Sequence, residues 1–179
     1  MNTFATPLCK LAFKYGTDKC PQLGHSYTEF YYELFKDKTE TVKKIVEIGV
    51  AWGSSLYMWR EFFPNAIIYG VDNNKLYLFN TDRIKTFFCD QSKATDLENI
   101  IKKVGDDIDL FVDDGSHIPE NQVSTCLTVM PLLNKKVVYA IEDVAHKEIT
   151  NNLGMYECQY KRKSNMLRHD DRLLIVRHK

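Results

Sequence analysis

The sequence lacks the features that mark several broad classes of protein. No apolar run approaches the ~20 residues that a helix needs to span a bilayer. Neither charge is in excess, because 24 Lys and Arg residues balance 24 Asp and Glu residues. A balanced chain does not provide the basic surface that attracts nucleic acids or anionic membranes. We therefore expect neither a nucleic-acid partner nor a membrane partner.

The chain also lacks signs of export and of disulfide bonding. Lys10 and Lys14 interrupt the apolar stretch that a secretory signal would need near the N-terminus. The five cysteines are odd in number and scattered, and no pair has C-x-x-C spacing. Such cysteines are typical of reduced thiols with a structural role. These features predict a cytoplasmic protein.

What the sequence does contain is an alternation of strand-like and helix-like segments, over a length of 179 residues that suits one domain. We expect strands at 43–50, 66–71, 84–89, 108–113 and 137–141, and helices at 26–36, 54–63, 95–104 and 119–129. Ser26 and Glu29 have the spacing of a capping box at the start of the first helix. Segments 155–161 and 172–178 predict a final antiparallel hairpin or two edge strands. The pattern predicts an α/β fold with a mostly parallel, twisted sheet and helices on both faces.

Each of the five strands that precede the hairpin ends in an acid. These acids are Glu47, Asp72, Asp90, Asp113 and Glu142. In an open parallel sheet, ligands bind outside the carboxyl ends of the strands, so the acids should share one edge. They would repel one another there unless cations or hydroxyl-rich ligands lie between them.

Two acidic motifs at this edge predict chemistry. Asp113-Asp114-Gly115-Ser116-His117 follows one strand and Glu142-Asp143 follows the next along the chain. Carboxylates are ligands that a hard divalent cation prefers, and a histidine beside them supplies a proton acceptor. The two motifs therefore indicate a candidate enzyme site.

The loop after the first strand predicts a nucleotide-like ligand. Gly49 and Gly53 allow the backbone to approach a ligand, and the helix that follows offers free N–H donors. The dinucleotide fingerprint is absent, because Ala51 stands where its second glycine belongs and Trp52 would crowd a pyrophosphate. The loop therefore suits a nucleoside without a diphosphate. Asp72 is placed to accept hydrogen bonds from ribose hydroxyls, and 90–91 to read the adenine edge.

Taken together, these motifs resemble a known family. In chain order they are Tyr15-Gly16-Thr17-Asp18-Lys19, His25-x-Tyr27, Val46-Glu47-Ile48-Gly49, Ser55-Leu56-x-Met58-Trp59, Phe63-Pro64-Asn65-Ala66, Tyr69-Gly70-Val71-Asp72, Asp90-Gln91, Asp113-Asp114-Gly115-Ser116-His117 and Ile141-Glu142-Asp143. The series resembles the class I S-adenosylmethionine (SAM)-dependent O-methyltransferases that act on sugar hydroxyls. It is most similar to the macrolide and rhamnosyl O-methyltransferases, with cephalosporin-hydroxylase-like proteins nearby. The resemblance covers about residues 11–145.

The resemblance implies a fold, a reaction and a set of roles. It implies a Rossmann-like methyltransferase domain over 1–179, in which 1–40 covers substrate and cofactor and 41–179 binds SAM. Magnesium, or another divalent cation, would be held by Asp114, Glu142 and Asp143. His117 would act as general base beside Asp114. The residues that would bind SAM are Glu47, Gly49, Gly53, Ser54, Ser55, Asp72, Asp90, Gln91 and Asp113.

The resemblance also implies a carbohydrate acceptor and leaves a homo-oligomer open. Asp18, Lys19, His25 and Tyr27 would contact the acceptor or cover the cofactor. An alternative for Asp18 and Lys19 is a surface ion pair worth under ~1 kcal/mol. Tyr27 also lies at helical spacing with Tyr31 and other apolar residues, which favours core packing.

The chain departs from the resemblance in two places. Asn134-Lys135-Lys136 stands where similar proteins have a glycine-rich turn, and only about 144–154 separates the Glu-Asp pair from the last hairpin. A lid trimmed in this way suits a large, exposed glycan. Two other functions stay open: a metal-dependent oxygenase, whose iron site needs two histidines and one carboxylate, and a non-catalytic nucleoside-binding module.

Overall fold

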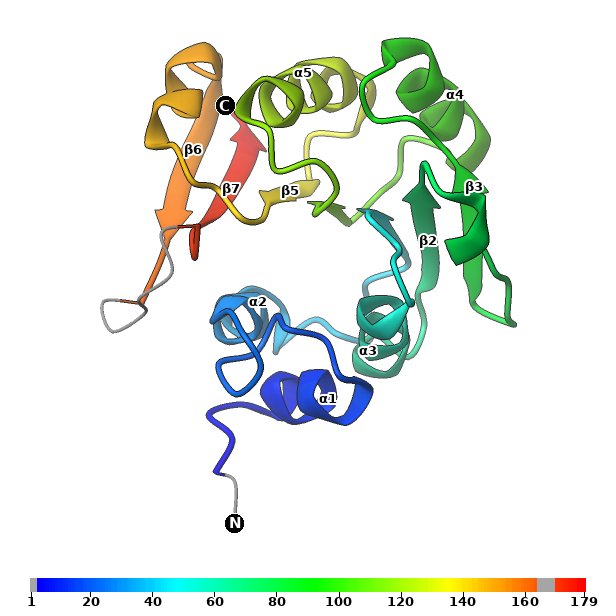
Figure 1. Ribbon diagram of the computed structural model, residues 1–179, viewed down its shortest axis with the longest axis vertical. Coiled ribbons are helices and arrows are strands. Elements are labelled where there is room, and N and C mark those ends of the chain that lie inside the picture. The colour runs from blue at the N-terminus through cyan, green and yellow to red at the C-terminus, as the bar shows by residue number, and fades with distance from the viewer. Residues whose placement is uncertain (1–2, 164–169) are drawn as a thin grey trace.

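The computed structural model describes residues 3–163 and 170–179, and a seven-stranded sheet lies at its centre (Figure 1). The strands are β1 (Lys44–Ile48), β2 (Ile67–Asp72), β3 (Ile84–Phe88), β4 (Leu110–Asp113), β5 (Val138–Ile141), β6 (Tyr156–Lys161) and β7 (Leu173–His178). Their order across the sheet is β3-β2-β1-β4-β5-β7-β6. The first five run parallel, whereas β7 is antiparallel to both β5 and β6. The order reverses at β1, so the crevice for a ligand lies beyond the ends of β1 and β4.

Helices cover both faces of the sheet (Figure 1). On one face lie α1 (Pro7–Tyr15), α2 (Tyr27–Phe35) and α3 (Ser54–Phe62), and on the other lie α4 (Ala94–Val104) and α5 (Pro119–Val129). Three short 3-10 helices are η1 (Lys75–Tyr77), η2 (Met130–Leu132) and η3 (Lys147–Asn152). Each face of the sheet has its own apolar core, because strands covered on both sides must bury side chains on both.

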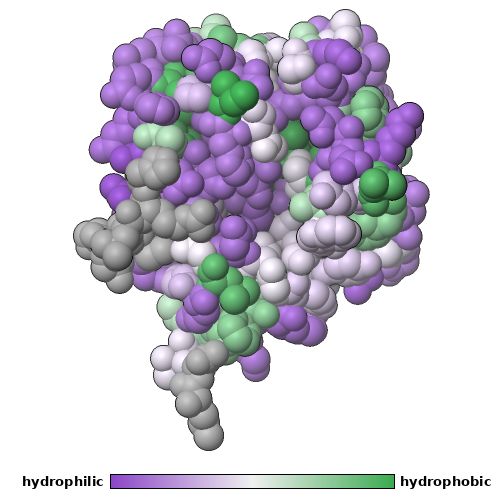
Figure 2. All heavy atoms as spheres, viewed as in Figure 1, coloured by the Kyte–Doolittle hydropathy of each residue, from purple (hydrophilic) through white to green (hydrophobic). Residues whose placement is uncertain are grey.

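The surface carries no helix that could cross a membrane, among the residues that the structure describes. The face in Figure 2 is mainly hydrophilic, with small separate groups of apolar side chains. Among the described residues, Trp52 and Leu76 are the most exposed large apolar side chains, at 82% and 88%. Scattered exposed apolar residues are normal on a globular domain.

The sequence predicted the fold class, the mostly parallel sheet and the C-terminal hairpin, and all three are confirmed. It missed helix α1. The signs of that helix were present, because Thr6 accepts a hydrogen bond from the N–H of Cys9, Pro7 opens the helix, and Gly16 ends it with φ 73°. The prediction that Ser26 and Glu29 form a capping box is wrong. The Ser26 side chain makes no helix-capping bond and donates to Asp171 instead.

Gly49 allows the ends of β1 and β4 to meet. Its φ is +94°, and a Cβ built on it would lie 2.1 Å from the carbonyl oxygen of Asp114. The N–H of Asp114 in turn donates to the carbonyl of Ile48 at 3.1 Å. Only glycine accepts both this backbone conformation and this contact. The loop after β1 therefore packs directly against the acidic motif after β4.

We expect Gly49→Ala to be more destabilising than Gly16→Ala. Gly16 also has a positive φ, but a Cβ there would meet nothing within 4 Å. Gly16→Ala therefore carries only the backbone cost of about 1–2 kcal/mol. Gly49→Ala adds an overpacking cost of about 1–3 kcal/mol. Denaturant unfolding of both variants measures the difference, and equal destabilisation would contradict the close approach of the two loops.

Candidate functional site

Three potential metal-ligating side chains meet beyond the ends of β4 and β5. The two strands are paired with Asp113 opposite Ile141, which brings the motifs that follow them together. One ligand atom each from Asp114, His117 and Asp143 lies within 4.8 Å of the others. The Nε2 atom of His117 is 3.6 Å from Oδ1 of Asp114 and 3.3 Å from Oδ2 of Asp143. We call these three residues the acid–histidine group.

Each carboxylate of the acid–histidine group is held from the N-terminal segment through one oxygen. Lys19 donates to Oδ2 of Asp114 at 2.5 Å, and the Tyr27 hydroxyl donates to Oδ1 of Asp143 at 2.7 Å. The opposite oxygen of each carboxylate faces His117. Both acids are thus fixed in orientation, with one oxygen each turned to the same point.

Glu142 has a different environment. Its Oε1 accepts from the Tyr31 hydroxyl at 2.7 Å and its Oε2 from Lys19 at 2.5 Å. It lies outside the acid–histidine group, although each carboxylate oxygen has more than one lone pair and can still accept a further partner. The ligand role of Glu142 therefore stays a prediction.

Lys19 is the cation among these acids. Its ammonium is 2.5 Å from Asp114 and from Glu142 and 3.6 Å from Glu47, and the residue is 1% exposed. Burial alone would lower the pKa of Lys19, but these three carboxylates raise it well above its usual value. Burial raises the pKa of Glu142, and Lys19 opposes that effect. The alternative of a surface ion pair between Asp18 and Lys19 is therefore wrong, because only Asp18 is at the surface.

His117 is half-exposed and tied to both acids. The nearby Asp114 carboxylate raises the pKa of His117 above its usual value, burial opposes this, and Asp143 adds to the rise. The side chain of His117 is 52% exposed, so an acceptor can reach the ring from solvent. The geometry therefore suits an exchange of protons at this ring.

The donor atoms of the acid–histidine group fit a divalent cation. Two carboxylates present one oxygen each, and hard cations such as magnesium take such oxygens together with water or substrate oxygens. The group has one histidine, whereas the iron site of an oxygenase needs two with one carboxylate. The observed donor set thus favours magnesium-type binding over the oxygenase alternative.

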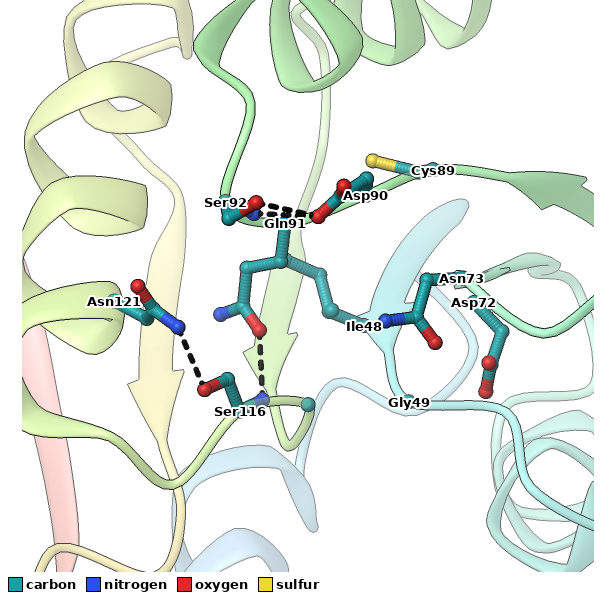
Figure 3. A pocket seen from close by; sticks show the side chains of 11 residues that line it. Ile48, Gly49, Asp72, Asn73, Cys89, Asp90, Gln91, Ser92, Ser116 and Asn121 are labelled. Atoms are coloured by element: carbon teal, nitrogen blue, oxygen red, sulfur yellow. Dashed lines mark hydrogen bonds between the residues drawn. The ribbon is translucent and has the colours of Figure 1, made fainter.

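A cavity of about 320 Å³ opens beside the group, between the ends of β1, β2, β3 and β4 (Figure 3). Its lining residues are Ile48, Gly49, Asp72, Asn73, Cys89, Asp90, Gln91, Ser92, Gly115, Ser116 and Asn121. Asp72 lies on one wall, where its carboxylate accepts hydrogen bonds from the N–H groups of Val50 and Ala51. It therefore shapes the glycine loop as well as the cavity.

Gln91 crosses between two strand ends in the same cavity (Figure 3). Its amide nitrogen donates to Asp113 at 2.5 Å, and its amide oxygen accepts from the N–H of Ser116 at 2.7 Å. The Gln91 amide is thus engaged within the protein. Asp90, the other residue predicted to contact the adenine edge, lines the cavity. Its carboxylate accepts a hydrogen bond from the hydroxyl of Ser92.

A second cavity, of about 210 Å³, shares Gly49 with the first. It is lined by Gly16, Thr17, Asp18, Gly49, Val50, Ala51, Trp52, Ser54, Ser55 and Asp114. The second cavity reaches Asp114 of the acid–histidine group. The two cavities therefore form neighbouring compartments at one edge of the sheet.

Three predicted SAM-binding residues, Glu47, Gly53 and Asp113, line neither cavity. Glu47 is fully buried and accepts from Ser55 and the Trp59 indole. Gly53 opens helix α3 with φ 79°. Burial raises the pKa of Asp113 to about 7, and its carboxylate holds Gln91. These residues support the cavity walls in the structure.

His25 and Tyr27, predicted to meet the acceptor, lie beneath Asp143 and are each 1% exposed. Asp18 is the exposed member of that set, with 61% of its side chain accessible. Tyr31 was interpreted as core, and its ring is buried, but its hydroxyl holds Glu142. The sign of this role was the spacing of Tyr27 and Tyr31, which places two hydroxyls on one face of α2.

Comparison with known proteins finds named relatives of this chain. No protein-family model matches the chain. The 8-demethyl-8-α-L-rhamnosyl tetracenomycin-C 2'-O-methyltransferase of Streptomyces olivaceus is 35% identical over 144 residues, which is 76% of this chain and 37% of that protein. The mycinamicin VI 2''-O-methyltransferase of Micromonospora griseorubida is 34% identical, over 76% of this chain and 36% of that protein.

Similar solved structures are also methyltransferases. The methyltransferase MycE in complex with Mg, SAH and mycinamycin VI has a TM-score of 0.78 and 26% identity, over 96% of this chain and 54% of that chain. This chain has the class I methyltransferase fold. Its relationship to the sugar O-methyltransferases, inferred from the motifs, is confirmed. The chain spans well under half the length of the two curated relatives.

We expect Lys19→Met to destabilise this methyltransferase fold by about 3–5 kcal/mol, because it leaves buried carboxylates without their cation. Burial raises the pKa of Glu47 and of Glu142, so the cost of leaving these two acids charged is present at neutral pH and disappears as they protonate. The loss of stability relative to wild type should therefore shrink as the pH falls from about 7 to about 5.

The matched control is Lys14→Met, which removes a lysine whose ion pair with Glu61 is exposed. Denaturant unfolding across this pH range should show no comparable change for the control. A Lys19→Met loss that does not vary with pH would contradict the assigned role of Lys19.

Proposed function

We propose that this chain catalyses metal-assisted transfer of a methyl group from SAM to a sugar hydroxyl. The observation that carries the proposal is the acid–histidine group beside two cavities at the edge of a methyltransferase sheet. The relatives named as sugar O-methyltransferases support the same reaction. A MycE complex contains Mg, SAH and mycinamycin VI, which supports the same cofactors for this chain.

The cavity between β1 and β4 would take the nucleoside part of SAM. Asp72 would accept hydrogen bonds from the ribose, and Asp90 would face the base. The neighbouring cavity, lined by Ser54 and Ser55 at the start of α3, would take the remaining part, because a helix start offers free N–H donors. Gly49 lies between the two and leaves room for the ligand to pass.

The divalent cation would be held by Asp114 and Asp143, with Glu142 as a further ligand. When bound, such a cation stabilises the negative charge that develops on the acceptor oxygen. Lys19, Tyr27 and Tyr31 keep these acids fixed, so the chain does not have to reorganise them during the reaction.

The Nε2 atom of His117 would accept the proton of the acceptor hydroxyl. A sugar hydroxyl holds its proton far too tightly to attack unaided at neutral pH, and an imidazole titrates in the range where a base is needed. The methyl sulfonium of SAM is already activated, so the protein mainly aligns the reacting oxygen, carbon and sulfur.

The acceptor would be a carbohydrate that approaches from the open side, where Asp18 and His117 are exposed. The short segment 144–154, which contains η3, suits a large glycan or glycosylated product such as a rhamnose-like acceptor. A single domain over 1–179, with 1–40 as the covering segment, and a cytoplasmic location belong to the same proposal. A homo-oligomer stays a prediction.

The test is mass spectrometry of a panel of rhamnosylated and other glycosylated acceptors incubated with the chain and SAM. We expect a gain of one methyl group on an acceptor sugar in the presence of magnesium, and none in excess EDTA. Circular dichroism in EDTA should show an intact fold. Binding of SAH without transfer to any acceptor would favour the nucleoside-binding module, and full transfer in EDTA would remove the metal from the proposal.

We expect His117→Ala to lower the rate constant of methyl transfer by about 10²–10⁴-fold, because the positioned base is lost. SAH affinity should stay close to wild type, since His117 lines neither cavity. The control is His146→Ala, which removes an exposed histidine that lies outside the acid–histidine group and lines neither cavity, so the rate should stay unchanged. An unaltered rate in His117→Ala would show that another group takes the proton.

A further inference from the structure

Asp171 is a buried acid with no role in the proposed reaction. It is fully buried and lies just before β7, beyond the part of the chain that carries the resemblance. Its Oδ1 accepts from the Nδ1 nitrogen of His25 at 3.1 Å and from the backbone N–H of Ser26 at 3.2 Å. Its Oδ2 accepts from the Ser26 hydroxyl at 3.4 Å. These hydrogen bonds compensate the carboxylate of Asp171 for its removal from water.

His25, which is one partner of Asp171, also faces the acid–histidine group. The other ring nitrogen of His25, Nε2, is buried and lies 3.3 Å from Oδ1 of Asp143, without a hydrogen bond of ordinary geometry. The His25 ring also stacks on Tyr27, with centroids 4.8 Å apart and planes at 16°. His25 therefore contacts Asp143 directly and also packs on the tyrosine that holds it.

Asp143 needs such support. Its φ is 52°, in the left-handed region, which is costly for a residue that is not glycine. Strain of this kind persists only where the surroundings over-determine it. The Tyr27 hydroxyl both donates to Oδ1 of Asp143 and accepts from its backbone N–H. The contacts of Tyr27 and His25 both fall on Oδ1, so Oδ2 is left to face His117.

We propose that Asp171 is a positioning residue for the metal centre. By fixing the ring of His25, it holds Asp143 with Oδ2 turned to the site of the cation. This inference rests on the proposed function. Partners that orient a metal ligand from behind change metal affinity by about 10–100-fold when they are removed. Asp171 would thereby tie the C-terminal hairpin to the metal centre.

The experiment measures the affinity of the full chain for Mn²⁺, which replaces magnesium and reports binding through its paramagnetic resonance. No SAM or acceptor is needed. We expect Asp171→Ala to weaken Mn²⁺ binding by about 10–100-fold. Asp171→Asn keeps an oxygen that accepts from His25 and should bind close to wild type. Ser26→Ala removes the hydroxyl contact of Asp171 but leaves His25 in place, so it should also bind like wild type.

His25→Asn tests the route of the effect. Its amide can still donate to Asp171 but does not reach Asp143, so we expect the same loss as in Asp171→Ala. It also replaces Asp171→Ala if that variant fails to fold. Wild-type affinity in Asp171→Ala or in His25→Asn would overturn the proposal, as would an equal loss in Ser26→Ala, which would indicate a general structural effect.

Failure of the proposed function has a different result. If the wild-type chain binds no Mn²⁺, the metal centre itself is lost, and this inference falls with it. If the wild-type chain binds Mn²⁺ and the variants bind equally well, only the role of Asp171 is lost.

Discussion

The rest of the site depends on one buried ammonium group. Parallel strands place their terminal acids at one edge of the sheet, where Glu47, Asp114 and Glu142 would repel one another in a medium of low polarity. Lys19 reaches all three from the N-terminal segment. The positive charge of Lys19 thus lets the acids lie close together. A bound cation then has to balance only the negative charge that Lys19 does not neutralise. This arrangement reconciles a stable fold with an acidic edge.

Much of this organisation could be predicted from the sequence, because it depends on local pattern and on the geometry of parallel sheets. The apolar segments before Asp113 and Glu142 were readable as buried strands, and paired parallel strands bring the residues after them together. Gly49 was expected to let the backbone approach a ligand, which stays a prediction; the structure adds that it lies against the carbonyl of Asp114. The acids, the histidine and the glycine loop were therefore visible in advance.

What the sequence did not reveal depends on contacts between distant segments. From the sequence, Lys19 was expected at the acceptor or cofactor and Tyr31 in the core. Only the packing of the N-terminal segment on the sheet gives them buried acids to hold. Ser26 has the spacing of a helix cap, but Asp171 competes for its hydroxyl from 145 residues away. The engaged amide of Gln91 likewise depends on a neighbouring strand end. Local spacing does not encode such competition.

The N-terminal origin of these anchors has a consequence for how the chain folds. Lys19 and Glu142 are 123 residues apart, and Tyr27 and Asp143 are 116 apart. Contacts with such wide separation form only after the loop-closure entropy between their segments has been overcome. The segment that carries Lys19 and Tyr27 precedes β5 in the chain, so it makes these contacts only after β5 has been synthesised. Until then the acids lack these partners, so we expect the site to become ordered late in folding.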